Sequence, residues 1–272
     1  MKATFILAVL ISSIFLLKAK AETADTTKED KHVDIEFEAN YLRHYIWRGA
    51  NFGSNDVSQS FISAEYKKWS LNLGVNCNLI PENLPSEYYT HPVIYDEQDI
   101  QLTYADEFKK VKYECSSFTY FYFNQINAPS TSEFSLKLYY PLNDHFSIVS
   151  ENVTDLWNHK KSYYTCNGLE LTFTVFKKFE IDWTLYNGSG NQHFNQAYYN
   201  SNSASWMNYS GSHIEINRPL GKDFYAKAFV EYNLYTSKNV IDFTGINHTS
   251  NFGFSIGKDV SIKLKRNHLH HL

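Results

Sequence analysis

The chain has 272 residues, a formal charge of −4, and 21 Tyr, 20 Phe and 5 Trp against only 2 Met and 6 Pro. The first 21 residues contain three lysines and no acid, so the chain that follows them carries −7. A nucleic-acid partner needs a basic surface and is therefore not expected. The mean hydropathy of −0.42 excludes a bundle of membrane helices, whereas an aromatic content of 17% suits strands and interfacial aromatic belts.

Residues 1–21 have the pattern of a secretory signal peptide. Lys2 supplies the positive start, residues 5–17 form an apolar core that is short for a membrane span, and Ala19-Lys20-Ala21 fits a cleavage site. The alternative is a single membrane anchor. Residues 22–32 are polar, and we expect them to be a disordered mature N-terminus.

Alternating apolar and polar residues recur from residue 33 onward. In the segment 69–79, every odd position is apolar and every even position is small or polar, which predicts a strand with one apolar face. Each segment is close to the ten residues that a tilted transmembrane strand needs. About twelve such segments are predicted: 33–48, 59–67, 69–79, 98–106, 111–124, 133–140, 145–156, 162–176, 179–187, 206–217, 223–236 and 250–264.

The connections between these segments alternate between short and long, which favours a barrel over a soluble β-sandwich. A sandwich would also alternate, but it would not be expected to sort its loops by length. The sequence predicts an all-β, antiparallel up-and-down transmembrane β-barrel over residues 33–264, with short periplasmic turns and long extracellular loops. Residues 265–272 form a C-terminal tail. We expect little regular order in the loops 80–97 and 188–205.

Three cysteines, Cys77, Cys115 and Cys166, lie in separate predicted strands without the spacing of a metal site. We expect them to be unbridged thiols, and the alternative is a Cys77–Cys166 bridge or another pairing among the three. No cofactor or metal is predicted.

The motif at residues 45–49, Tyr-Ile-Trp-Arg-Gly, resembles the TorF-like (Gcw_chp) family of bacterial outer-membrane proteins. Members of that family continue with a polar loop, a strand that contains Gln, and a hairpin into an alternating strand, and Gln59 and residues 74–79 stand in similar places here. The resemblance covers about 50 residues and implies a membrane barrel of no established activity. The chain departs from outer-membrane barrels in ending on Lys265-Arg-Asn-His-Leu-His-His-Leu272 rather than on an aromatic residue.

Polar residues at alternate strand positions are the candidates to line the barrel lumen. We expect a water-filled, acidic lumen that favours cations or other small solutes. The alternative is a plugged structural barrel in which the acids pair with Arg48, Lys137 and Lys227. The candidates are Asp34, Glu36, Glu38, Asn40, His44, Arg48, Glu65, Asp99, Lys137, Glu170, Glu180, Asp182, His213, Glu215, Lys227 and Glu231.

An enzymatic alternative depends on His248 and Ser250, which are two residues apart and would face the bilayer together on the last strand. A lipid hydrolase needs imidazole to accept the serine proton and a third group to orient the ring, and the sequence assigns no such group. We therefore predict a passive channel or structural barrel without catalytic residues. Its expected partner is the outer-membrane bilayer of a Gram-negative bacterium, and the sequence gives no indication of its oligomeric state.

Overall fold

The computed structural model describes residues 32–53, 56–79, 97–122, 129–199, 201 and 205–263. The predicted signal peptide, residues 22–31 and the tail 265–272 lie outside these described residues. The barrel unit comprises His32–Ile262 and is described by itself below.

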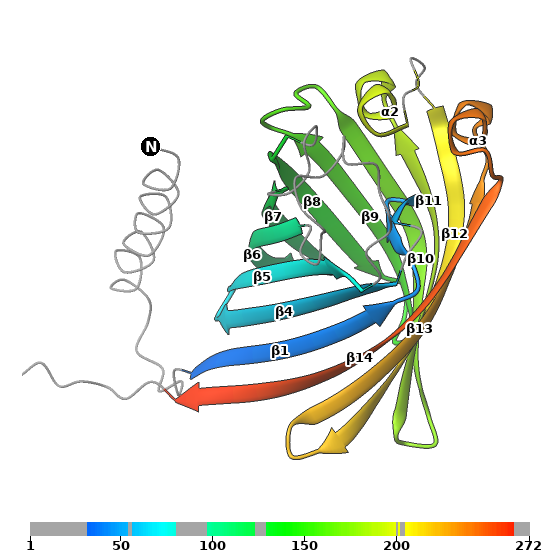
Figure 1. Ribbon diagram of the computed structural model, residues 1–272. Coiled ribbons are helices and arrows are strands. Elements are labelled where there is room, and N and C mark those ends of the chain that lie inside the picture. Colours follow the sequence, from blue (N-terminus) through cyan, green and yellow to red (C-terminus); the bar gives the residue numbers. More distant parts are fainter. Residues whose placement is uncertain are drawn as a thin grey trace, which may run out of the picture. The chain divides into compact units, whose positions relative to one another are not determined.

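Twelve antiparallel strands form one closed barrel, in which each strand pairs with the next along the chain and β14 pairs with β1 (Figure 1). This confirms the predicted fold class and excludes the sandwich. The barrel strands are β1 (His32–Leu42), β4 (Val57–Tyr66), β5 (Trp69–Asn78), β6 (Glu97–Phe108), β7 (Val111–Phe121), β8 (Thr131–Pro141), β9 (Phe146–Asp155), β10 (Tyr163–Val175), β11 (Phe179–Gly190), β12 (Ser205–Gly221), β13 (Phe224–Tyr235) and β14 (His248–Lys263).

The first predicted segment, 33–48, is two elements rather than one strand. β1 ends at Leu42, and the chain bends at residues 43–44 before β2 (Tyr45–Trp47) pairs with β3 (Ala50–Gly53) in a separate small sheet. The alternation of the sequence runs through this bend, so the pattern alone did not reveal it.

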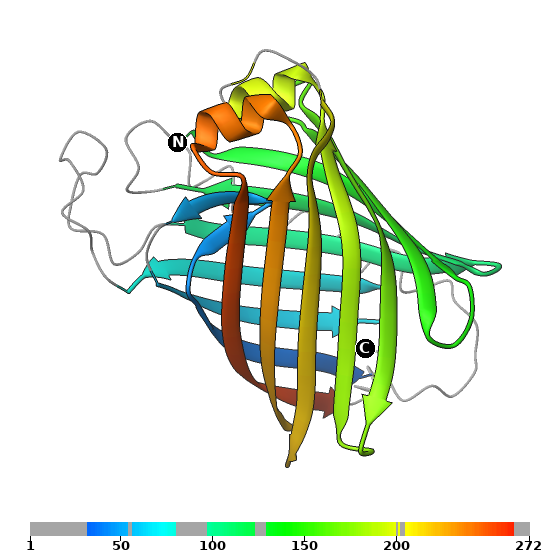
Figure 2. The same ribbon diagram turned by 90° about the vertical axis from the view of Figure 1, so that its right-hand side faces the viewer.

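Two short helices lie at the same end of the barrel (Figure 2). They are α2 (Gln192–Tyr199) and α3 (Lys238–Thr244). The expectation of little regular order in the loop 188–205 was therefore wrong, because α2 occupies half of it. Among the described residues, no helix combines the length and apolar character that a membrane span requires.

The connections are sorted by length between the two ends of the barrel. The short ones join β4 to β5, β6 to β7, β8 to β9, β10 to β11 and β12 to β13, and the first and last residues of the barrel lie at the same end as these turns. We call this the short-turn end. The other end carries the β2–β3 hairpin, α2, α3 and the remaining connections, and we call it the long-loop end.

Side chains alternate between an exposed apolar outer face and a polar inner face. In β14, residues at odd positions from Thr249 to Gly257 are buried and those at even positions from His248 to Ile256 are exposed. The same alternation leaves large apolar side chains exposed on strands all around the barrel, among them Phe37, Leu73, Phe134, Leu185 and Val230, the last with 58% of its surface exposed. This outer face is suited to hydrocarbon rather than to water.

The two faces predict losses of stability of different size when a positive charge is introduced on β12. Ile214 lies on the outer face between Trp183 and Val230, whereas the neighbouring His213 lies on the inner face with its ring on Phe229. Ile214→Lys should lower the free energy of unfolding in lipid vesicles by about 2–4 kcal/mol if this position lies near the bilayer midplane. His213→Lys should lower it by less than about 1 kcal/mol. Urea denaturation followed by tryptophan fluorescence measures both, and equal losses would contradict the assignment of faces.

Candidate functional site: the barrel interior

The β2–β3 hairpin is the centre of the interior at the long-loop end. Its turn, Arg48-Gly49, has positive φ at both residues, 48° and 79°, as a two-residue hairpin turn of the primed type requires. Gly49 is needed for a second reason, since a Cβ there would lie 2.5 Å from the ring of Tyr209 on β12. The hairpin thus packs directly on the inner wall of the barrel.

Arg48 forms a two-point ion pair with Glu133 of β8. The Nη1–Oε1 and Nη2–Oε2 distances are 2.7 and 2.5 Å, and only 12% and 2% of the two side chains is exposed. The guanidinium also lies 4.0 Å from the ring centre of Trp47 and 4.9 Å from that of Tyr164. A planar guanidinium suits this combination of paired hydrogen bonds and ring contacts better than an ammonium does.

The carbonyl groups of the turn are also bonded to the surrounding wall. The Tyr199 hydroxyl of α2 donates to the Arg48 carbonyl at 2.8 Å, and the Tyr235 hydroxyl of β13 donates to the Gly49 carbonyl at 2.6 Å. Both tyrosines belong to a buried cluster that also contains Val153, Tyr164, Phe194, Tyr209 and Val240. We call these seven residues the aromatic cluster. It fills the interior beside β9, β10, β12 and β13 and fixes the hairpin there.

The start of the hairpin is held by strands on either side. The backbone N–H of His44 donates to Asn251 Oδ1 of β14 and its carbonyl accepts from Asn251 Nδ2, at 3.0 and 2.9 Å. Tyr45 donates its hydroxyl to Glu97 of β6 at 3.2 Å. Asp56, just before β4, accepts hydrogen bonds from Tyr41 and Arg43, and these bonds lower the pKa of its carboxyl group.

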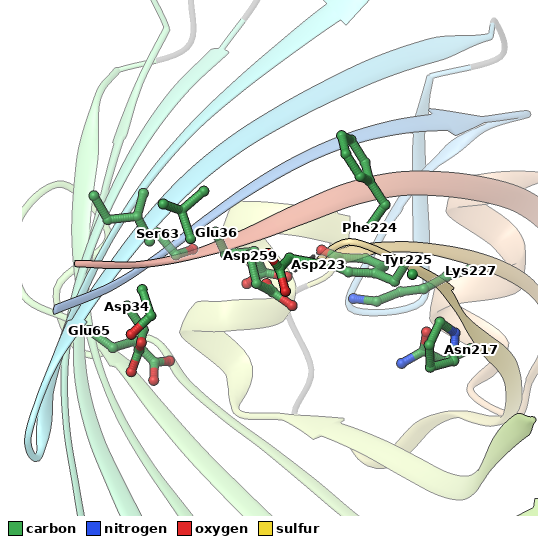
Figure 3. Close-up of a pocket in the computed structure, with 15 residues that line it drawn as sticks. Asp34, Glu36, Ser63, Glu65, Asn217, Asp223, Phe224, Tyr225, Lys227 and Asp259 are labelled. Carbon is green, nitrogen blue, oxygen red and sulfur yellow. Dashed lines mark hydrogen bonds between the residues drawn. The ribbon is translucent and has the colours of Figure 1, made fainter. Parts of the chain in front are cut away.

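A cavity of about 730 Å³ opens at the short-turn end (Figure 3). Its lining includes five acids from β1, β4, the β12–β13 turn and β14, together with a single lysine. Figure 3 shows Asp34 and Glu65 beside one another, in agreement with their direct pairing in the sheet. The charged lining residues are Asp34, Glu36, Glu65, Asp223, Lys227 and Asp259. We call this space the acidic vestibule.

Inside the vestibule, one lysine and one tyrosine of β13 reach across β14 to β1. Lys227 Nζ lies 2.7 Å from Glu38 Oε2, and the Tyr225 hydroxyl donates to both Glu36 and Glu38. The intervening strand β14 permits this contact because residue 257 is a glycine. A Cβ at that position would lie 2.1 Å from the Tyr225 ring and would block it. Asp34 Oδ2 lies 3.1 Å from His32 Nε2, and the other acids of the lining have no ion pair with a base among the described residues.

The other predicted candidates lie on inner-face positions between the two ends. Lys137 of β8 stands directly between Glu114 and Glu151 in the sheet, with its ammonium 4.7 Å from the Tyr139 ring. Asp182 lies opposite Glu215 and accepts a hydrogen bond from Thr172 at 2.5 Å. Glu231 accepts from the Tyr186 hydroxyl at 2.9 Å, while Glu170 and Glu180 lie on β10 and β11 opposite threonines.

Sequence reasoning missed several inner-face acids, of which Glu97 and Glu133 have the largest consequences. The alternation of the strands could have identified both residues. Glu133 lies four positions before Lys137 on β8, and Glu97 lies two positions before Asp99 on β6, so each faces the same side as a residue that was predicted. Glu97 lies one residue before the predicted segment 98–106, and Glu133 is the first residue of the predicted segment 133–140. Their partners Tyr45 and Arg48 lie far away in the sequence, and no local pattern indicates such a contact.

His248 and Ser250 are both on the outer face of β14, as the hydrolase alternative required. His248 Nδ1 lies 2.8 Å from Asn247 Oδ1, and its ring stacks on Tyr232. Among the described residues, no carboxylate contacts His248, and no hydrogen bond joins it to Ser250.

The described part of the chain also contains no group of three or more His, Cys, Asp or Glu side chains placed to hold a metal ion. The three cysteines are thiols.

The chain is similar in fold to several solved outer-membrane proteins. The KdgM porin shares 10% identity over 84% of this chain and 99% of its own, with a TM-score of 0.49, and the NanC porin shares 10% over 85% and 100%, also with 0.49. An outer-membrane channel from Pseudomonas putida F1 shares 7% over 88% and 98%, with 0.47. At these TM-scores the likenesses carry no argument for function. No family model and no curated protein matches the chain.

The Arg48–Glu133 pair predicts a large effect from removing one partner. Arg48→Met should lower the free energy of unfolding by about 3–5 kcal/mol, because it leaves the Glu133 carboxylate buried and uncompensated. The double variant Arg48→Met with Glu133→Gln should recover part of this loss, since no charge then remains. Denaturation in detergent micelles measures both variants. A single variant as stable as the unaltered protein would show that the pair does not hold the hairpin.

Proposed function

We propose that the protein is a passive, porin-like channel of the bacterial outer membrane whose interior favours cations and small cationic solutes. The observation that carries the proposal is the acidic vestibule, which has five acids and one lysine, and that lysine is already paired with Glu38. Uncompensated acids around a water-filled space create a negative potential that concentrates cations.

The outer face supports the membrane location. A closed barrel leaves no unpaired strand edge, and its exposed apolar side chains need a hydrocarbon environment. With the N-terminal signal that the sequence predicts, the short-turn end would face the periplasm and the long-loop end the exterior. The proposal also includes the division of the chain into a signal peptide, a mature N-terminus, the barrel and a C-terminal tail. It further includes membership of the TorF-like family, which is supported by the motif at residues 45–49.

The hairpin limits the proposed passage to one side of the barrel. It is anchored on the aromatic cluster beside β9–β13, while the inner faces of β1 and β4 carry the polar residues Asn40 and Gln59 at the same level. The charge of Arg48 is neutralised by Glu133, so it does not oppose the acids. A structural barrel that stays closed is the competing role.

Ion selectivity measured in planar bilayers tests the channel. Under a salt gradient, the unaltered protein should show current steps and a reversal potential on the cation-selective side. The triple variant Asp34→Asn, Glu36→Gln, Glu65→Gln should lower the cation-to-anion permeability ratio by about two- to threefold per removed charge, since a charge about 7 Å from an ion in water contributes about 0.6 kcal/mol.

The matched control is Asp106→Asn. Asp106 lies near the same end but on the outer face, where it binds Lys68 and Tyr104, so the permeability ratio should not change. Folded protein that gives no current would leave only the structural role, and an anion-selective current would contradict the acidic interior.

The proposal includes no catalytic step. Ser250→Ala should leave the rate of phospholipid hydrolysis at the background level of the unaltered protein, because His248 is oriented by an amide and an aromatic ring rather than by an acid. Release of fatty acid from mixed micelles measures this. A rate that falls on substitution would instead favour the hydrolase.

A further inference from the structure

We propose that Glu97, Asp99 and Asn76 form a binding site for a hard, oxygen-preferring cation of the calcium class beside the β2–β3 hairpin. The inference deepens the proposed function, because it names a position at which a passing cation would stop. None of the observations below depends on the vestibule at the opposite end of the barrel.

Asn76 of β5 is the first observation. It is only 3% exposed, yet neither its Oδ1 nor its Nδ2 has a hydrogen-bond partner among the residues that the structure describes. A buried amide without partners loses its hydrogen bonds to water and gains none in return, so its retention in the interior calls for a ligand. Within the described part of the chain, Asp99 Oδ1 of β6 and Asn40 Oδ1 of β1 are also buried without a hydrogen-bond partner.

The sheet brings Asn76 and the two acids together. Asn76 lies directly opposite Glu97, and Gly74, two residues earlier on the same face of β5, lies directly opposite Asp99. Side chains opposite or diagonal to one another on a sheet are within roughly 5–8 Å. Glu97 and Asp99 are also two residues apart on one strand, so both carboxylates face the same side as Asn76.

The chemistry of these groups indicates the ligand. Two carboxylates and an amide carbonyl supply oxygen donors, which hard cations such as Ca²⁺ prefer over nitrogen or sulfur donors. Two adjacent acids away from bulk water need either a shared proton or a compensating positive charge, and a bound cation supplies the latter. Among the described residues, no base forms an ion pair with Asp99.

The surroundings give the site a preformed shape. Tyr45 of the hairpin donates its hydroxyl to Glu97, and Tyr120 lies directly opposite Asp99 in the sheet while its own hydroxyl bonds to Glu133. Tyr120 therefore stands between the acids and the Arg48–Glu133 pair. With two carboxylates instead of the three or more of a structural site, binding should be weak and exchangeable, with a Kd of about 10⁻⁴–10⁻³ M for Ca²⁺.

Terbium luminescence tests the site without requiring any current. Tb³⁺ substitutes for Ca²⁺ and emits when nearby tyrosines are excited, and Tyr45 and Tyr120 adjoin the proposed ligands. The full-length protein, folded in detergent micelles, should give saturable emission that Ca²⁺ displaces. Asp99→Asn should weaken this binding about tenfold or more, and Asn76→Asp should strengthen it, because each changes the charge of the site by one.

Glu36→Gln is the matched control, because it removes an acid beside Tyr225 in the vestibule and should leave the Asp99-dependent emission unchanged. Heat-modifiable migration on a gel shows that each variant is folded. Emission unaffected by both Asp99→Asn and Asn76→Asp would overturn the site, as water molecules or a shared proton would then satisfy these groups. Binding without current would instead uphold the site and remove the channel.

Discussion

Closure of the sheet is the constraint on which the other features of this protein depend. A strand edge in hydrocarbon would leave backbone N–H and C=O groups unpaired at a cost of several kcal/mol each, so a sheet with an apolar outer face has to pair its last strand with its first. Pairing of β14 with β1 meets this condition. Because side chains alternate along every strand, closure also commits each second residue to a shared interior, where polar groups need partners or water.

Inward-facing side chains fit inside the barrel because neighbouring strands contribute side chains of different size. The buried positions of β14 are Thr249, Asn251, Gly253, Ser255 and Gly257, none of them large. The rings of Phe229 and Tyr225 from β13 lie across the two glycines, and Tyr225 thereby reaches Glu36 and Glu38 on β1. A larger residue at Gly257 would remove this connection, so a small-residue strand is what allows polar groups two strands apart to satisfy one another.

The sequence predicted the strands and their faces because both follow from a local repeat of two residues. Strands such as β5 and β11 match the predicted segments to within a few residues, and the sorted turns identified the barrel. The hairpin was not predicted, since Tyr45 and Trp47 continue the alternation of β1 and the Arg48–Glu133 contact joins residues 85 positions apart. Helix α2 lies in a polar segment rich in Asn and Gln. Its position depends on Phe194 and Tyr199, which are buried in the aromatic cluster beside the hairpin.

In the proposed channel, the position of the hairpin would also decide which wall of the barrel a solute meets. Its backbone carbonyls are bonded by Tyr199 and Tyr235, and Trp47 packs on Phe194, so the aromatic side is filled. The only cation of its turn, Arg48, is matched to Glu133 and adds no net charge. Glu97 and Asp99 lie beyond Tyr120, and the Arg48 guanidinium is held against Glu133 rather than against these two acids. In the proposed channel, the charge of Arg48 would therefore not oppose them.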